Sequence, residues 1–374
     1  MNLAYLSGTA IPSDQASTIH VVKMAQALAQ VPSNRSVRLY GYSGSETSLA
    51  AHYGVEPAFD PILWPQPTIP VGWGFHFAWS VRQHQRWLAP AQRADAFYGR
   101  HVHGLVAAAR LGLPVGYEAH ALPSGRLKRT LERHLFMQRT FRALVCITEA
   151  LAEDYRQWLA DDLPITVLPD AADAVNPAAP LRPLSDWPGR ADTLQVGFVG
   201  HLYPGKGMEL IVQLAPRLPH VDFHIVGGRS QDVDRWRAQS TAPNLYFHGY
   251  VPHADLPAYY ARLDVGLLPL QSAVHTADGR REIGRWTSPL KAFEYMAHGL
   301  VILASDLPVL REVFSDQQNA LLLPADEPQR WADTLSRIST APQGRSDLGR
   351  RARSDFLARY TWSARAERVS ALMA

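Results

Sequence analysis

A glycine-rich turn that carries a lysine offers the clearest chemistry in this sequence. The segment Val196–Gly207 (VGFVGHLYPGKG) predicts a buried strand that leads into a turn holding Lys206, followed by a helix over Met208–Leu218. Backbone N–H groups of such a turn, and the start of the helix, can hold a phosphate. The lysine ammonium adds a mobile positive charge. The alternative interpretation is an ordinary turn with a solvated lysine.

A second candidate anion site is the start of the helix predicted by Ser288–Gly299 (SPLKAFEYMAHG). Ser288 suits the N-cap and Pro289 suits the first helical position, so the helix beginning is well marked. Glu294 lies more than a turn further along the helix. Its carboxylate could accept two hydrogen bonds from a vicinal diol such as that of a ribose. The alternative is a partly exposed helical glutamate with no ligand.

Short apolar runs alternate with longer amphipathic stretches along both halves of the chain. This alternation predicts parallel sheets covered by helices on both faces. The proline-rich segment 176–192 indicates a linker, so we expect two doubly wound domains with ligands at the carboxyl ends of the strands, in the cleft between the domains. The predicted strands are Asn2–Leu6, Val37–Tyr40, Ala96–Tyr98, Val115–Tyr117, Leu144–Ile147, Ile165–Leu168, Gln195–Val199, Asp222–Val226, Leu245–Phe247, Val265–Pro269, Val301–Ala304 and Ala320–Leu323.

Composition sets the frame for these motifs. The chain has 374 residues, of which 47% are hydrophobic and 19% charged, as in an ordinary globular protein of two domains. Its net charge of +3 gives no indication of a nucleic-acid partner, and we expect none. The one cysteine, Cys146, fits a reducing compartment. Without an 18-residue apolar run or a basic N-terminal region, the expected location is the cytoplasm.

The motifs resemble those of one family of enzymes. The run Ser288–Val313 is similar to the donor-binding signature of the retaining, nucleotide-sugar-dependent glycosyltransferases of family 4 (glycosyl transferases group 1), which have the α/β GT-B fold. The turn GHLYPGKG resembles the family's diphosphate loop, and YEAH, Tyr117–His120, resembles its cleft-lining histidine segment. The resemblance implies an N-terminal acceptor-side domain (1–178), a C-terminal nucleotide-sugar domain (179–356), and a final helix (357–374) that returns to the first domain.

The resemblance also implies roles for individual residues. Glu294 would bind the ribose hydroxyls, Lys206 would neutralise the leaving diphosphate, and His120 would face the transferred sugar. Independently, His120 directly follows a predicted strand, where side chains face ligands. The remaining donor-binding positions implied are Gly8 beneath the donor, Tyr250 and Val251 near the base, and the phosphate-binding positions Gly200, His201, Gly205, Ser288, Pro289 and Leu290.

Two positions depart from the family pattern. Many members have an arginine where this chain has His201, and a neutral histidine offers one donor where arginine offers a fork. Many members also have an acidic residue eight positions before the glutamate that corresponds to Glu294. This chain has Trp286 at that position. Glu282 lies four residues earlier and could replace it if the loop bulges.

The implied reaction is a front-face displacement with retention, in which the acceptor hydroxyl gives its proton to a phosphate oxygen. Lys206 and His201 would stabilise the charge on the β-phosphate, so no cofactor and no metal are expected. The sequence shows no His/Asp cluster with ligand spacing. The expected enzyme is a hexosyltransferase that uses a UDP- or GDP-linked sugar in cell-surface polysaccharide or glycolipid synthesis. The alternative is an inactive nucleotide-sugar-binding or partner protein on the same fold.

The acceptor side has weaker signals. Arg100, His101 and His103 follow a strand end, and the sequence leaves open a metal pair, a polar loop lining an acceptor pocket, or a solvated turn. The segment 125–142 carries six cations with leucines and phenylalanines at helical spacing. Such a basic amphipathic helix can rest on an anionic membrane surface, which would place the protein at the inner face of the plasma membrane. The alternative is a helix that packs its apolar face on the sheet.

Overall fold

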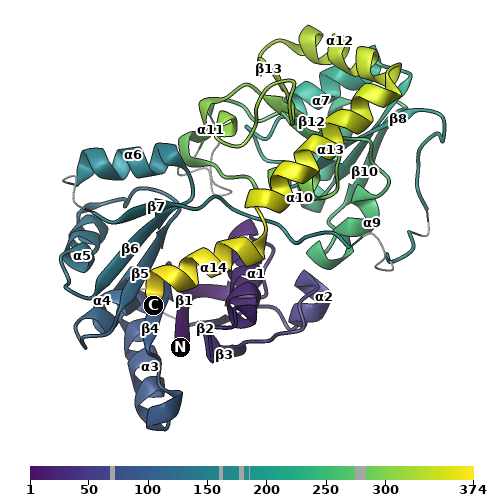
Figure 1. Ribbon diagram of the computed structural model, residues 1–374. Helices are drawn as coiled ribbons and strands as arrows, with labels where there is room; N and C mark the ends of the chain where they lie inside the picture. Colours follow the sequence, from purple (N-terminus) through teal and green to yellow (C-terminus); the bar gives the residue numbers. More distant parts are fainter. Residues whose placement is uncertain (68–71, 160–162, 177–180, 185, 274–283) are drawn as a thin grey trace. The chain divides into compact units, whose positions relative to one another are not determined.

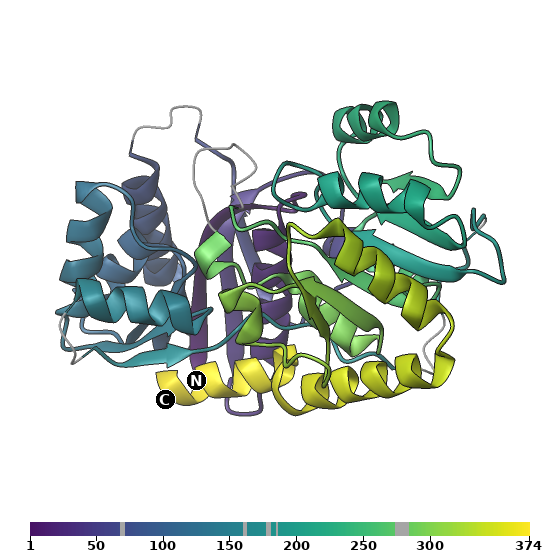
Figure 2. The same ribbon diagram turned by 90° about the horizontal axis from the view of Figure 1, so that it is seen from above.

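The computed structural model describes residues 1–67, 72–159, 163–176, 181–184, 186–273 and 284–374. The chain divides into two compact units, Met1–Pro169 with Trp362–Ala374, and Asp170–Thr361. The boundaries expected from the sequence, 178/179 and 356/357, lie a few residues away. In each unit a parallel sheet has helices on both faces (Figure 1, Figure 2).

Unit 1 holds a sheet whose described strands run in the order β3-β2-β1-β4-β5-β6-β7, all parallel. The strands are β1 (Asn2–Ile11), β2 (Ser36–Ser43), β3 (Asp60–Trp64), β4 (Ala96–Gly99), β5 (Val115–Ala119), β6 (Phe141–Cys146) and β7 (Ile165–Val167). The helices are α1 (Ala16–Gln30), α2 (Leu49–Tyr53), α3 (Trp73–Trp87), α4 (Val102–Ala109), α5 (Arg126–Phe136), α6 (Glu149–Trp158) and α14 (Trp362–Met373). The last helix of the chain, α14, packs beside α1 (Figure 1).

Unit 2 repeats this architecture, with the described strands in the order β10-β9-β8-β11-β12-β13, again all parallel. The strands are β8 (Leu194–Val199), β9 (Val221–Val226), β10 (Leu245–Gly249), β11 (Val265–Leu268), β12 (Val301–Ser305) and β13 (Leu321–Leu323). The helices are α7 (Met208–Leu214), α8 (Ser230–Gln239), α9 (Leu256–Tyr260), α10 (Leu290–Ala297), α11 (Pro308–Arg311), α12 (Pro328–Ser339) and α13 (Pro342–Arg359).

The core of unit 2 explains the continuous apolar runs in its strands. In β12, Val301 and Leu303 pack on the face covered by α7, α8 and α12, whereas Ile302 and Ala304 pack on the face covered by α10 and α13. Because successive side chains of a strand point to opposite faces, a strand buried on both sides must be apolar throughout. The predicted α/β fold with two Rossmann-like domains is confirmed.

One strand was not predicted from the sequence, and two helices were predicted too long. Helix α7 ends at Leu214 and not at Leu218, because the short 3₁₀ helix η2 (Ala215–Arg217) follows it. Strand β3 begins with Asp60 and Pro61 and lies at the edge of its sheet, where a missing N–H is tolerated. Helix α5 ends at Phe136, and Phe141 already belongs to β6, because that segment pairs with β5. The prediction of one basic helix up to Arg142 is therefore wrong. None of the described helices is both long and apolar enough to span a membrane.

Candidate donor site and a buried charge cluster

The loop that carries Lys206 follows β8, at the point where the strand order of unit 2 reverses between β8 and β11. Parallel doubly wound sheets bind ligands at this point, beyond the carboxyl ends of the strands. The loop is held against the segment after β11, since the Gln271 N–H donates to the Gly205 carbonyl at 3.0 Å. Gly207 has φ +95°, and a Cβ there would lie 2.1 Å from the Pro269 carbonyl oxygen, so only glycine fits.

The side chain of Lys206 is partly buried rather than freely solvated. Its Nζ lies 5.3 Å from the ring centroid of Tyr203, and burial lowers the pKa of the ammonium to about 8. The ammonium is thus mostly protonated at neutral pH. The ring of His201 stacks on the same Tyr203 with centroids 5.6 Å apart. Lys206 and His201, expected on the same diphosphate, both pack on Tyr203.

Helix α10 begins one residue later than the sequence indicated. Pro289 is the N-cap, and the predicted cap Ser288 is wrong, because its Oγ instead accepts a hydrogen bond from the Asp170 N–H at 3.0 Å. The helix starts at Leu290, and its end before Gly299 is as predicted. Helix α10 also reaches the start of the lysine loop, since the Tyr295 hydroxyl accepts a hydrogen bond from the Val199 N–H.

Glu294 is buried in unit 2, with only 7% of the residue exposed, and both carboxylate oxygens have protein partners. Oε1 lies 3.1 Å from Nε2 of His253, and Oε2 accepts from the Lys291 Nζ at 2.6 Å and from the Tyr260 hydroxyl. Burial alone would raise the pKa of Glu294, but Lys291 and His253 hold it well below its usual range. Glu294 is therefore an anion and not the partly exposed helical glutamate of the alternative interpretation.

These partners were missed by the sequence reasoning. Lys291 could have been found, because a pair at i and i+3 shares one helix face. His253 lies in the short 3₁₀ helix η3 (His253–Asp255) and Tyr260 in α9, 41 and 34 residues before Glu294, and no local spacing indicates them. A ribose diol that binds Glu294 must share or replace these donors.

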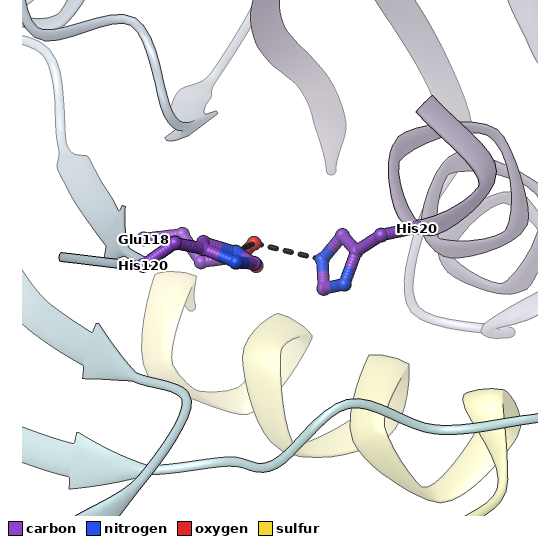
Figure 3. A group of neighbouring side chains, drawn as sticks. All are labelled: His20, Glu118 and His120. Carbon is purple, nitrogen blue, oxygen red and sulfur yellow. Dashed lines mark hydrogen bonds and ion pairs between the residues drawn. The ribbon is translucent and has the colours of Figure 1, made fainter. Parts of the chain in front are cut away.

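In unit 1, His120 directly follows β5, and its Nε2 lies 2.7 Å from Oε1 of the buried Glu118. His20, from α1, approaches the same oxygen, also at 2.7 Å (Figure 3). The ligand atoms of these three residues lie within 4.8 Å of one another. No local pattern in the sequence indicates this cluster, since His20 lies far from the other two residues along the chain.

The other residues expected on the acceptor side have local roles. His101 is the N-cap of α4, where its Nδ1 accepts from the Gly104 N–H at 3.2 Å. Burial lowers the pKa of His101 to about 3. The ring of His103 packs on Phe75, and the Arg100 guanidinium donates to a carbonyl of α1. A solvated turn is therefore wrong for His101.

Gly8 and the expected base-binding residues can also be located. Gly8 has φ +66°, and a Cβ there would lie 2.4 Å from the His101 ring, so this histidine already requires a glycine. Tyr250 is half-exposed, and Val251 packs against the core of unit 2. Trp286 ends the short helix η4 (Gly284–Trp286). Glu282 lies outside the described residues.

Comparison with known proteins finds relatives of similar sequence. The phosphatidyl-myo-inositol mannosyltransferase of Mycolicibacterium smegmatis is 30% identical over 222 residues, which cover 57% of this chain and 53% of that protein. The GDP-mannose-dependent alpha-mannosyltransferase of the same organism is 34% identical over 131 residues, 35% of this chain and 30% of that protein. The chain thus spans about half the length, or less, of these curated relatives.

Two solved structures match nearly the whole chain. HepE of Anabaena, solved in complex with UDP, has a TM-score of 0.70 at 16% identity and covers 99% of both chains. The sucrose-phosphate synthase of Thermosynechococcus elongatus has a TM-score of 0.70 at 18% identity, covering 100% of this chain and 98% of that one. Together with the two Rossmann-like units, these likenesses define the GT-B fold. Residues 193–341 match the family described as glycosyl transferases group 1. This domain is therefore similar to the family that the sequence motifs implied.

Proposed function

We propose that this protein is a retaining glycosyltransferase of family 4, which moves a sugar from a nucleotide-sugar donor to a hydroxyl of a glycan or glycolipid acceptor in cell-surface polysaccharide synthesis. The observation that carries the proposal is the position of Lys206. Its loop follows the first strand of the matched domain, at the reversal of strand order, and its ammonium is protonated at neutral pH. A leaving diphosphate needs such a charge.

In the proposed reaction, the bond between the sugar and the β-phosphate lengthens first, and negative charge grows on the phosphate oxygens. Lys206, with His201 beside it and the backbone at Ser288–Leu290, stabilises that charge. The acceptor hydroxyl attacks from the face that the phosphate leaves, and a phosphate oxygen takes its proton. The anomeric configuration is then retained. Fixed positive charges do the work of a metal ion in this scheme, and no cofactor takes part.

The donor is proposed to be a UDP- or GDP-linked hexose. Support comes from two relatives, one named for GDP-mannose and one solved with UDP. Glu294 is the proposed partner of the ribose hydroxyls, because its carboxylate is ionised and its neighbours Lys291 and His253 are themselves 19% and 16% exposed. A diol can therefore reach the carboxylate by displacing side chains that already contact solvent.

We also propose that the protein attaches peripherally to an anionic membrane and that the acceptor lies there. In α5, Leu135 is buried while Leu127 is 64% exposed, so the helix packs one end of its apolar face and leaves the other uncovered. Helix α3 exposes Phe75, Trp79 and Trp87. Flotation with anionic liposomes tests this part. Reversing the charges of Arg126 and Arg129 should abolish flotation, and neutral liposomes are the control.

The central test is transfer by purified protein with UDP- and GDP-sugars. Lys206→Ala should lower turnover about 10²- to 10³-fold, as expected for loss of a charge-stabilising group, while the thermal unfolding temperature stays unchanged. The matched control is Arg217→Ala, which removes a positive charge from an exposed turn of the same unit. Near-normal turnover of Lys206→Ala would contradict the proposal. Activity that survives EDTA, and a product with the donor's anomeric configuration, test metal independence and retention.

The same assay separates the alternative function. His201 and Trp286 depart from the family pattern, and a protein that binds nucleotide sugars without transferring or hydrolysing them would be the inactive binding protein. Binding alone would be seen as a raised unfolding temperature with the nucleotide sugar and no released nucleotide.

A further inference from the structure

Glu118 is an acidic side chain in the interior of unit 1, with 1% of the residue exposed. It follows Tyr117 in β5, and four side chains from separate elements converge on it. They are His20 of α1, Tyr98 of β4, His120 beyond the end of β5, and Arg365 of α14. Figure 3 shows His20 pointing toward Glu118 from α1, opposite the segment that carries Glu118 at the end of β5 and His120 just beyond it.

The two carboxylate oxygens of Glu118 have different partners. Oε1 faces both imidazoles, with the Nε2 atoms of His20 and His120 each 2.7 Å away. Oε2 accepts hydrogen bonds from the Tyr98 hydroxyl and from Nη1 of Arg365 at 3.1 Å. The Arg365 guanidinium thus lies at Oε2, and the two imidazole rings lie at Oε1.

Charge and burial settle the protonation of this cluster. Burial alone would raise the pKa of Glu118, but His20 and Arg365, with the hydrogen bond from His120, hold it well below its usual range. Glu118 is therefore an anion. Burial and the nearby Arg100 lower the pKa of His120 to about 4, so its imidazole is neutral at physiological pH. A neutral imidazole has one N–H, and the 2.7 Å contact with the anion places it on Nε2.

We propose that Glu118 is a positioning residue for the transfer reaction. By accepting the Nε2–H of His120, it leaves the Nδ1 lone pair of that ring as a hydrogen-bond acceptor for a sugar hydroxyl. Arg365 keeps the carboxylate ionised, so the C-terminal helix α14 also contributes to positioning His120. The effect on catalysis rests on the proposed function. The state of His120 rests only on its contacts, its burial and the charges around it.

The spacing favours this arrangement over a bound cation. Zinc holds nitrogen and oxygen ligands at about 2.0–2.2 Å in tetrahedral geometry, which keeps the ligand atoms roughly 3.3 Å apart. The two Nε2–Oε1 distances are only 2.7 Å, and the contact from His120 is a hydrogen bond. A metal ion would also share one carboxylate with Arg365, which is 4% exposed.

The first experiment reads the state of His120 directly, by NMR of the whole protein labelled with ¹⁵N-histidine. The signals of this residue are those lost in His120→Gln. We expect the Nε2–H form in the wild type and its loss in Glu118→Gln, because an amide can donate as well as accept. The wild-type spectrum decides even if that variant does not fold: an Nδ1–H or charged His120 overturns the proposal. Ring signals that move when EDTA is added would overturn it in favour of a bound cation.

The second experiment measures the consequence for transfer. Glu118→Gln should lower kcat about 10- to 100-fold, as when other partners that orient an imidazole are removed, with the KM for the donor changed less than about threefold. The matched control is Glu132→Gln, which alters another fully buried carboxylate of unit 1 that accepts from Tyr117 and Tyr155. Glu132→Gln should leave kcat and the His120 spectrum unchanged. Equal losses in both variants would overturn the proposal, whereas an inactive wild type with the expected spectrum would contradict only the proposed function.

Discussion

Each unit of this protein buries one glutamate among a tyrosine, a cation and at least one histidine. Glu118 in unit 1 has its carboxylate fully enclosed, and the side chain of its cation Arg365 is 3% exposed. The side chain of Glu294 in unit 2 is 9% exposed, and that of its cation Lys291 is 19% exposed. The cation of Glu118 comes from a distant helix, α14, whereas Lys291 lies one helical turn from Glu294 in the same helix. A ligand can therefore reach Glu294 itself, but Glu118 can act on a ligand only through His120, whose side chain is 20% exposed.

Removing the cation from each cluster should give the largest difference between the two glutamates. Arg365→Met should lower the free energy of unfolding by about 3–5 kcal/mol, because Glu118 would remain a buried anion without its cation. Lys291→Met should cost only about 1 kcal/mol, since water can reach Glu294 when the lysine is gone. Urea unfolding of both variants measures the two costs. Equal costs would show that the two glutamates are equally enclosed.

Replacing the second glutamate sharpens the comparison from the ligand side. Glu294→Gln should raise the dissociation constant for the nucleoside diphosphate about 10- to 100-fold, because hydrogen bonds from the ribose to a charged acceptor are lost. Glu118→Gln should leave this constant unchanged. Titration calorimetry with UDP and GDP measures both. Weaker nucleotide binding by Glu118→Gln would contradict the division of roles.

The pH profile gives the smallest of these effects. Both glutamates have pKa values below the usual range, so neither titrates near neutral pH. Lys206, with a pKa of about 8, loses its charge as the pH rises. Below pH 8 its stabilising charge is present, and kcat/KM should fall about tenfold per pH unit above it. In Lys206→Arg the alkaline limb should move beyond pH 10. A limb near pH 8 that persists in this variant would exclude Lys206 as its source.

Much of the fold and part of the candidate donor site were predictable from local pattern. The apolar runs located the other strands to within a few residues, because a strand buried on both faces has few alternatives to an apolar sequence. The glycine turn with Lys206 was recognisable because the residue types can be read from the sequence: a glycine, which tolerates the positive φ found at position 207, and a charged side chain beside it. The α10 residues Lys291 and Glu294 share one face for the same local reason.

The remaining features depend on contacts between distant parts of the chain. The hydroxyl of Ser288 could cap α10, but the Asp170 N–H, 118 residues away, takes it instead. Strand β3 forms although it starts with Asp-Pro, because it lies at the edge of its sheet. The end of the basic segment forms strand β6 and not a helix, because it pairs with β5.

The sequence by itself determined two doubly wound domains and a lysine in the glycine-rich turn after the first strand of the second, because periodicity and glycine turns act over a few residues. The tertiary structure alone decided the state of Glu118 and His120. Their partner His20 belongs to the first segment of unit 1 and Arg365 to its last segment, and Arg365 lies 247 residues from Glu118 along the chain. Burial and charge at a site depend on everything packed around it, and no local spacing encodes that.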